Sequence, residues 1–535
     1  MSTAVAARAP KLADQHWVHV AGIVALVFGG WLLLAWLLAG RHLLPFPWEL
    51  AAQFVADASL LASNIGPTLW VAAQGFFWGT VAILPLAALS VIWPVVEPIV
   101  VRVAVVIHVI PFVAIAPIIV VTMPGMPARI TIAALQVYFP LLIGVLLGLK
   151  STDDRAVDVV DASGGGAWSI FRFVRVPSAL PNLVAALQIA VPSAILGALI
   201  AEFFGADRGL GAILVNAQDA LLTERVWVIA ITIGLIATAG YGLVTLLARI
   251  FFPWAGKGGS VGTNVAGAEQ GGAIKPWQAV AGIVVSIVLL VGLWWSLRPV
   301  FGLDAFFVKD PVDVWGFLTQ GNPITSAPPS VFWGQFAAAA GQTAVHAGVG
   351  FVVGTAVAVA GAILLVAAPG LERAAMPFAI IVRSMPLVAL TPLIVLLFGR
   401  GLLGVTVLVT LVTFFPTLVT VILGLRAAPE GALDVVRASG GSSLTAALKV
   451  RLMYAIPAIT ASARIAIPAA VSGAMLAEWL ATGDGLGNLI TLAAVNADYY
   501  VLWSSGVIIV LLVLGLYSLI NTVDRAVSRR LGIAF

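Results

Sequence analysis

The stretch DVVDASGG, residues 158–165, returns as DVVRASGG at residues 434–441, 276 positions later, with one letter changed. Each copy is polar and lies between long apolar runs. A polar loop that stays the same while the surrounding apolar segments diverge indicates that both copies meet the same kind of surface. The plainer interpretation is an ordinary loop whose Asp and Gly residues end helices, and the duplication argues against it.

Composition places the chain in a membrane. Of its 535 residues, 61% are hydrophobic and 9% are charged, and the mean hydropathy is +1.11. Soluble proteins carry about 25% charged residues, and a bilayer span needs roughly 20 mostly apolar residues. Continuous apolar runs exclude a β-barrel, whose strands alternate. We therefore predict an all-α polytopic membrane protein with about 12 transmembrane helices.

Twelve apolar runs fall into two sets of six. They lie near 19–39, 68–92, 99–121, 130–149, 182–203, 227–252, 277–297, 343–367, 374–397, 402–425, 457–478 and 503–523. The first run is longer than a signal-peptide core, so we predict an uncleaved span. The chain divides into a first half (1–252), a Gly- and Ala-rich linker (253–276) and a second half (277–535). Segments near 47–62 and 310–320 are predicted to be interfacial helices.

Other segments repeat at the same offset. IPFVAIAPIIV at 110–120 matches MPLVALTPLIV at 385–395, and AEFFGADRGLG at 201–211 matches AEWLATGDGLG at 477–487. An even number of spans per half makes the repeat parallel, with its axis along the membrane normal and the pathway between the halves. Lys and Arg number 18 in the segments then predicted to be cytoplasmic and seven in the outer ones. Both termini and both DVV loops are thus predicted to be cytoplasmic.

The duplicated loop resembles the "EAA" loop of ABC-importer permeases, which forms the coupling helix that docks on the ATPase subunit. The family pattern falls on Asp158, Val159, Val160, Gly164, Asp434, Val435, Val436 and Gly440. Asp stands for the family's Glu, Val stands for both of its Ala residues, and Met453 stands where the first half has Pro177. The resemblance covers nearly the whole chain and implies two permease copies fused in one polypeptide.

The proline segments and the AE…GLG segments resemble the nitrate/sulfonate/taurine branch of these permeases. The resemblance implies a pathway for a small anionic solute in the plasma membrane, with a thiamine-precursor-like or other small organic solute as the alternative. It implies two ABC ATPase subunits and an extracytoplasmic solute-binding protein as partners, besides membrane lipid. No G-x-x-x-x-G-K-[ST] motif occurs in the sequence, so we expect ATP and magnesium on the partner ATPase and no cofactor on this chain.

Eight residues are candidates for the translocation path: His108, Pro111, Pro117, Glu202, Arg383, Pro386, Pro392 and Glu478. Ionisable residues at membrane depth are functional candidates, and prolines that break a span are tolerated where it lines a cavity. The alternatives are that Glu202 and Glu478 are satisfied by the Gly-rich backbone that follows them, and that His108 and Arg383 lie at helix ends. No catalytic or metal site is expected.

Other classes of protein remain as alternatives. An ion-coupled secondary carrier typically shows inverted repeats and acidic relays at membrane depth. Here the repeat is parallel and membrane carboxylates are few. The absence of cysteine excludes disulfides and Cys-ligated metals, and the small net charge of +4 gives no sign of a nucleic-acid partner. Co-purification of an ATPase discriminates an importer from a carrier or channel.

Overall fold

The fold is helical throughout the part that the computed structural model describes, which is residues 25, 28–41, 44–93, 95–123, 125–253, 276–368, 370–372 and 387–531. These residues contain no strand, which confirms the all-α prediction. The helices of the first half are α2 (Pro47–Ala56), α3 (Ala58–Ile92), α4 (Glu97–Val109), α5 (Phe112–Thr122), α6 (Met126–Lys150), α7 (Asp154–Ala162), α8 (Ala167–Ile170), α9 (Val176–Phe203), α10 (Leu210–Asp219) and α11 (Thr223–Phe251).

The second half repeats this order of elements. Its helices are α12 (Pro276–Phe301), α13 (Pro311–Gln320), α14 (Pro329–Ala367), α16 (Leu387–Phe398), α17 (Leu402–Arg426), α18 (Glu430–Ala438), α19 (Ser443–Ala446), α20 (Leu452–Ala477), α21 (Gly485–Val495) and α22 (Tyr499–Leu531). Single π-helical turns join α8 to α9 and α19 to α20. The helices α6 and α17 occupy equivalent places, because α6 packs on α3 and α9 and α17 packs on α14 and α20.

Nine of the described helices are long and apolar enough to cross a membrane, and they match nine of the twelve predicted spans. The predicted first and ninth spans lie partly outside the described residues. The third span is not the single run expected over 99–121. It breaks between α4 and α5 because Pro111 has no backbone N–H and disfavours helical geometry at Ile110, whose ψ is 121°. Pro117, by contrast, lies inside α5.

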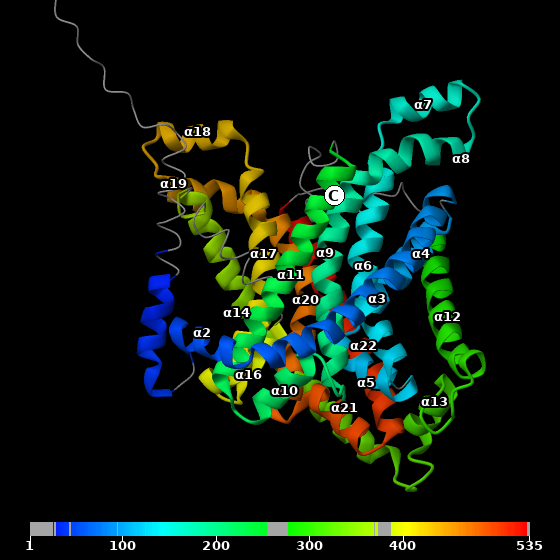
Figure 1. The fold of residues 1–535 in the computed structure, drawn as a ribbon. Coiled ribbons are helices and arrows are strands. Elements are labelled where there is room, and N and C mark those ends of the chain that lie inside the picture. Colours follow the sequence, from blue (N-terminus) through cyan, green and yellow to red (C-terminus); the bar gives the residue numbers. More distant parts are fainter. Residues whose placement is uncertain are drawn as a thin grey trace, which may run out of the picture.

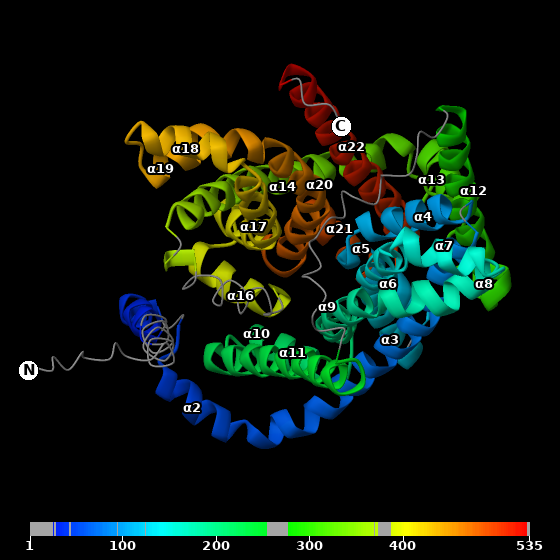
Figure 2. The same cartoon turned by 90° about the horizontal axis from the view of Figure 1, so that it is seen from above.

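The two ends of the molecule carry different elements. Figure 1 shows α7 and α8 on one side and α18 and α19 on the other, all at the same end, while α10, α13 and α21 lie at the opposite end. Seen along that direction, α5, α9 and α20 lie toward the middle and α3 runs along the periphery (Figure 2). The halves interlock, because α12 packs on α4 and α5 packs on α21 and α22.

Helices are present at both positions where interfacial helices are predicted, although the first is shorter than predicted, and their place at the membrane surface stays a prediction. The first is α2, and it ends at Asp57, a buried residue whose carboxylate accepts hydrogen bonds from Arg225 at 2.8 and 3.0 Å and from Gln53 at 2.7 Å. Burial raises the pKa of Asp57, but these hydrogen bonds outweigh it and hold the pKa below its ordinary value. The second is α13, whose N-terminus is capped by Asp310. Both helices lie on the side of the molecule away from α7 and α18 (Figure 1).

Small residues let the spans approach closely. A Cβ atom placed on Gly75 of α3 would lie 2.3 Å from the Cβ of Ala133 on α6 and 2.9 Å from the backbone there. In the second half, a Cβ on Gly350 of α14 would lie 2.4 Å from the Cβ of Val409 on α17. Close backbone approach of this kind is the main source of helix association in lipid.

We therefore expect Gly75→Ala to lower stability by about 1–3 kcal/mol, because α3 and α6 must separate to admit the methyl group. Gly348→Ala on the equivalent helix α14 is the matched control, since nothing lies within 4 Å of a Cβ there and no proline follows it. It should be neutral or stabilising by up to about 1 kcal/mol, the helix-propensity difference. Thermal unfolding of the detergent-solubilised chain measures both. Equal effects of the two changes would contradict the packing role of Gly75.

Candidate functional site

Each predicted coupling loop is a short helix ended by a glycine turn. The helix α7 starts where the Asp153 carboxylate accepts the Arg155 N–H at 3.0 Å. It ends at Gly164, whose φ is +78°, and the Gly165 N–H donates to the Val160 carbonyl at 2.9 Å. In the second loop φ of Gly440 is +77° and the equivalent hydrogen bond is again 2.9 Å long. This is the αL helix end that glycine favours.

The three loop positions 164, 165 and 166 have different needs. Position 164 requires a left-handed backbone. Position 165 requires the absence of a side chain, because a Cβ on Gly165 would lie 2.5 Å from Cγ1 of Val160. Position 166 requires neither, and the second loop has Ser442 there, whose hydroxyl accepts the Thr445 N–H at 3.2 Å. Both halves therefore have glycine at the two positions where the turn requires it, and they differ at the third.

Both loops present apolar side chains away from the protein. Val159 and Val435, at equivalent positions, are each 66% exposed, and Trp168 beyond the first turn is 62% exposed. The acids Asp158 and Asp434 beside these valines are exposed as well. Val160 and Val436 instead turn inward and are half-buried against the glycine turns. Exposed apolar groups outside the bilayer, rimmed by charges, mark an interaction surface.

Paired contacts tie each loop to its own half. Lys150, just before the first loop, donates to Glu97 at 2.6 Å, and the equivalent Arg426 pairs with Glu372 at 2.6 Å. After the turn, Arg175 donates to the Val91 carbonyl at 2.9 Å, and Arg451 donates to the Leu425 carbonyl at 3.1 Å. Sequence analysis missed the two glutamates. The repeat could have identified them, because Glu97 and Glu372 are 275 residues apart, which is the repeat offset in this region.

Glu202 caps the helix that follows it. Its side chain is 1% exposed, and Oε2 accepts the Gly211 N–H at 2.7 Å and the Thr68 hydroxyl at 3.0 Å. The Thr68 hydroxyl oxygen in turn accepts the Leu210 N–H at 2.8 Å, and the Asn64 side chain accepts the Gly209 N–H at 2.8 Å. The first N–H groups of α10 are thereby satisfied, as helix N-termini require.

Glu478 makes the same contacts at the start of α21, with one addition, while Ala339 stands where the first half has Asn64. It is fully buried, and Oε2 accepts the Gly487 N–H at 2.9 Å and the Thr343 hydroxyl at 2.8 Å. Oε1 lies 2.9 Å from Nδ1 of His346, which is also buried. Val71 occupies the place of His346 in the first half, and among the described residues Oε1 of Glu202 has no hydrogen-bond partner.

These contacts match the alternative in which both carboxylates are satisfied by the Gly-rich backbone, and their role as path residues stays a prediction. His108 stacks on Phe139, with ring centroids 3.8 Å apart, one turn before the break at Pro111. Arg383 and Pro386 lie outside the described residues, and Pro392 lies within α16. The described residues contain no cluster of metal-binding side chains.

An aromatic contact joins the halves directly beyond the two caps. The ring of Phe204, which follows α9, stacks on the ring of Trp479, which follows α20, with centroids 4.6 Å apart and planes 6° apart. Phe203 contacts Trp479 at 6.0 Å. All three residues are buried or half-buried. The contact joins the two halves near the end of the molecule opposite the predicted coupling loops.

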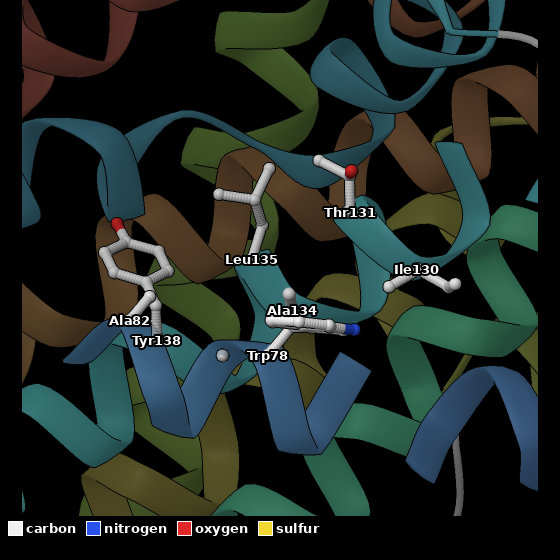
Figure 3. Close-up of a pocket in the computed structure, with 8 residues that line it drawn as sticks. Trp78, Ala82, Ile130, Thr131, Ala134, Leu135 and Tyr138 are labelled. Atoms are coloured by element: carbon white, nitrogen blue, oxygen red, sulfur yellow. The ribbon is translucent and has the colours of Figure 1, made fainter. Parts of the chain in front are cut away.

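A separate hollow of about 280 Å³ lies between α3 and α6. Figure 3 shows Trp78 on one wall and Ile130, Thr131, Leu135 and Tyr138 on the other. The lining is mostly apolar and comes from the first half alone. This hollow is therefore not the path between the halves.

The caps yield a prediction about stability. Glu478→Ala should lower stability by about 3 kcal/mol, because it leaves His346, Thr343 and the Gly487 N–H buried without their acceptor. Glu202→Ala should cost about half as much, because no histidine loses a partner there. Apparent Tm in detergent measures both variants. A larger loss for Glu202→Ala would contradict the assignment of His346 to the Glu478 cap.

Comparison with known proteins agrees with this geometry. The family model described as "Binding-protein-dependent transport system inner membrane component" matches twice, at residues 79–257 and 350–533. No solved structure matches the chain.

Three curated relatives show the range of the similarity. The riboflavin transport system permease protein RibX of Chloroflexus aurantiacus is 32% identical over 146 residues, which is 27% of this chain and 54% of that protein. The formylaminopyrimidine transport permease protein ThiX of Halalkalibacterium halodurans is 27% identical over 229 residues, 42% of this chain and 92% of that protein. The putative aliphatic sulfonates transport permease protein SsuC of Escherichia coli is 28% identical over 127 residues, 24% of this chain and 48% of that protein.

The chain thus spans about half the length of two of these relatives and nearly all of the third. The two family matches cover most of each half, and their ends, at residues 257 and 533, are 276 residues apart, which is the repeat offset found in the sequence. The chain is a multi-pass membrane protein that belongs to the family of binding-protein-dependent transport system inner membrane components, the permeases of ABC transporters, and it carries two copies of that domain in one polypeptide.

Proposed function

We propose that this chain forms the complete translocation pathway of an ABC importer and is driven by two separate ATPase subunits, one on each coupling loop. The observation that carries the proposal is the pair of loops with the same glycine turn and an equally exposed valine, Val159 and Val435. Two matching surfaces at one end of a pseudo-symmetric molecule suit a pair of similar partners. The chain itself is a transporter subunit and supplies no ATPase motif.

In this mechanism, ATP and magnesium act on the ATPase subunits. Closure of the two ATPases moves the coupling loops, and the ion pairs Lys150–Glu97 and Arg426–Glu372 carry that movement into the spans of each half. The two halves rock, and the stack of Phe204 on Trp479 separates to admit solute from the outer face. Nucleotide shifts this equilibrium because the ATPase pair binds the two permease conformations with different affinity. Both termini and the linker at 253–276 are cytoplasmic in this topology.

The solute we propose is small and anionic, like nitrate, a sulfonate or taurine, delivered by an extracytoplasmic binding protein. Similarity to the sulfonate permease SsuC supports this class. So does the burial of Glu202 and Glu478 in helix caps, because carboxylates facing the path would repel an anion. A thiamine-precursor-like or other small organic solute is the second candidate, favoured by the similarity to nearly the whole length of ThiX.

A pull-down tests the importer proposal. We expect an ATPase to co-purify with the intact chain and to be lost from a variant with both Gly164→Arg and Gly440→Arg, because a bulky residue cannot easily adopt φ near +78°. The variant's apparent Tm and elution volume show whether the membrane core is still folded. If no ATPase accompanies the intact chain under mild solubilisation, the importer proposal fails and an ion-coupled carrier becomes the better hypothesis.

A crosslinking experiment tests the rocking motion. The chain has no cysteine, so Phe204→Cys with Trp479→Cys places a single thiol pair across the halves. A short bifunctional thiol reagent should crosslink it without nucleotide, and ATP trapped on the ATPases should reduce the yield at least about twofold as the population shifts.

The matched control pair is Phe306→Cys with Tyr499→Cys. Their rings are 5.2 Å apart within the second half, so their crosslinking should not respond to nucleotide. A nucleotide response of equal size in both pairs would show that the contact between Phe204 and Trp479 does not report on movement of the halves.

A further inference from the structure

The single letter that differs between the two loop motifs reverses a charge on an exposed surface. Asp161 of the first loop corresponds to Arg437 of the second, and both are exposed. The other seven letters of the motif are the same in both loops, including the valines, the glycine turn and the serine before it. The reversal therefore falls on a surface whose geometry the two loops share.

Arg437 is held by acids of its own loop. Its guanidinium lies 2.9 Å from Asp434 and 3.3 Å from Glu430, and all three side chains are more than half exposed. A cation in the last turn of a helix also interacts favourably with the helix dipole. The charges of the second loop thus compensate one another without a partner.

Asp161 is in the opposite situation. It lies in the last turn of α7, where a negative charge opposes the helix dipole, and three residues from Asp158, where a like charge on the same face is repulsive. Within the described residues, no basic side chain lies within ion-pair distance of either aspartate. Residues 153–161 contain four acids and one arginine, against two acids and one arginine in residues 429–437.

A charge placed where local structure disfavours it indicates compensation from outside. The structure assigns the two coupling loops unequal electrostatic roles: the first docks on an ATPase groove with a basic rim, and the second docks mainly through its apolar face. This inference rests on the proposed function and specifies its partner surface. Asp158 and Asp161 can pair with basic side chains of the ATPase groove, whereas Asp434 already pairs with Arg437 of its own loop.

Two variants of the full chain, each with one of the two glycine turns disrupted, allow ATPase binding to each loop to be measured separately. Gly440→Arg leaves the first loop as the intact dock, and Gly164→Arg leaves the second. The probe is the ATPase subunit that co-purifies with the intact chain, and the measurement is its Kd for each variant in nanodiscs from about 0.05 M to about 0.5 M salt. We expect the first loop to bind about fivefold more tightly at low salt, and the difference to disappear at high salt.

Charge exchange at the differing position provides the decisive variants. In the Gly440→Arg background, Asp161→Arg should flatten the salt dependence to that of the second loop. In the Gly164→Arg background, Arg437→Asp should steepen it to that of the first loop. Both positions are exposed, so neither change disturbs packing. Asp207→Arg, an equal charge change on the exposed segment between α9 and α10 at the far end, is the control and should have no effect.

The outcomes separate this inference from the proposed function. If no ATPase binds the intact chain, the proposed function itself fails. If an ATPase binds and needs the glycine turns, but both loops show the same salt dependence or the second shows the steeper one, only the unequal roles are overturned. The criterion is the same whether one ATPase polypeptide or two co-purify, since it concerns which loop carries the salt dependence.

Discussion

A helix that begins among buried residues must have its first backbone N–H groups satisfied by the protein, because they have no partner within the helix and no water reaches them. The fifth span of each half meets this constraint with one carboxylate. Glu202 and Glu478 bind the first N–H groups of α10 and α21 and are themselves joined to α3 and α14 through Thr68 and Thr343. Each cap fixes three elements together, and it sets the place where Phe204 and Trp479 meet across the halves.

The opposite end of each half is fixed by different chemistry for a related reason. There the backbone leaves the membrane, and Gly164 and Gly440 close the turn at positive φ. Arginine side chains then bind carbonyls at the ends of neighbouring helices, as Arg175 does with Val91. In the proposed mechanism, these contacts at both ends would let a force on a coupling loop move the whole half rather than bend the loop. The structure is therefore suited to passing movement from α7 and α18 to the aromatic contact.

The sequence predicted most of the fold because hydropathy and repetition are local signals. Apolar runs located nine spans that the described structure contains, and the repeated glycines located both turns. The prolines indicated a break in the third span, but the sequence did not show that the break falls at Pro111 while Pro117 stays inside α5. It also did not predict the early starts of α3 and α14. Nor did it reveal the His346–Glu478 contact or the stack across the halves. Such contacts join segments more than 130 residues apart, and no periodicity encodes them.

Fusion of the two copies explains which features diverge. In a dimer of identical chains every residue is the same on both sides, whereas a fused chain encodes each half separately. Features that satisfy the backbone are the same in both halves here, namely the carboxylate caps and the glycine turns. Some features that pair side chains differ, although the ion pairs Lys150–Glu97 and Arg426–Glu372 are equivalent. Val71 occupies the place of His346, and Asp161 occupies the place of Arg437. Gln188, which donates a hydrogen bond to Thr245, occupies the place of Arg464, which pairs with Asp524. A buried backbone group must always be satisfied, whereas one side-chain pair can be replaced by another, so a fused chain can vary its side-chain pairs and keep its carboxylate caps and glycine turns.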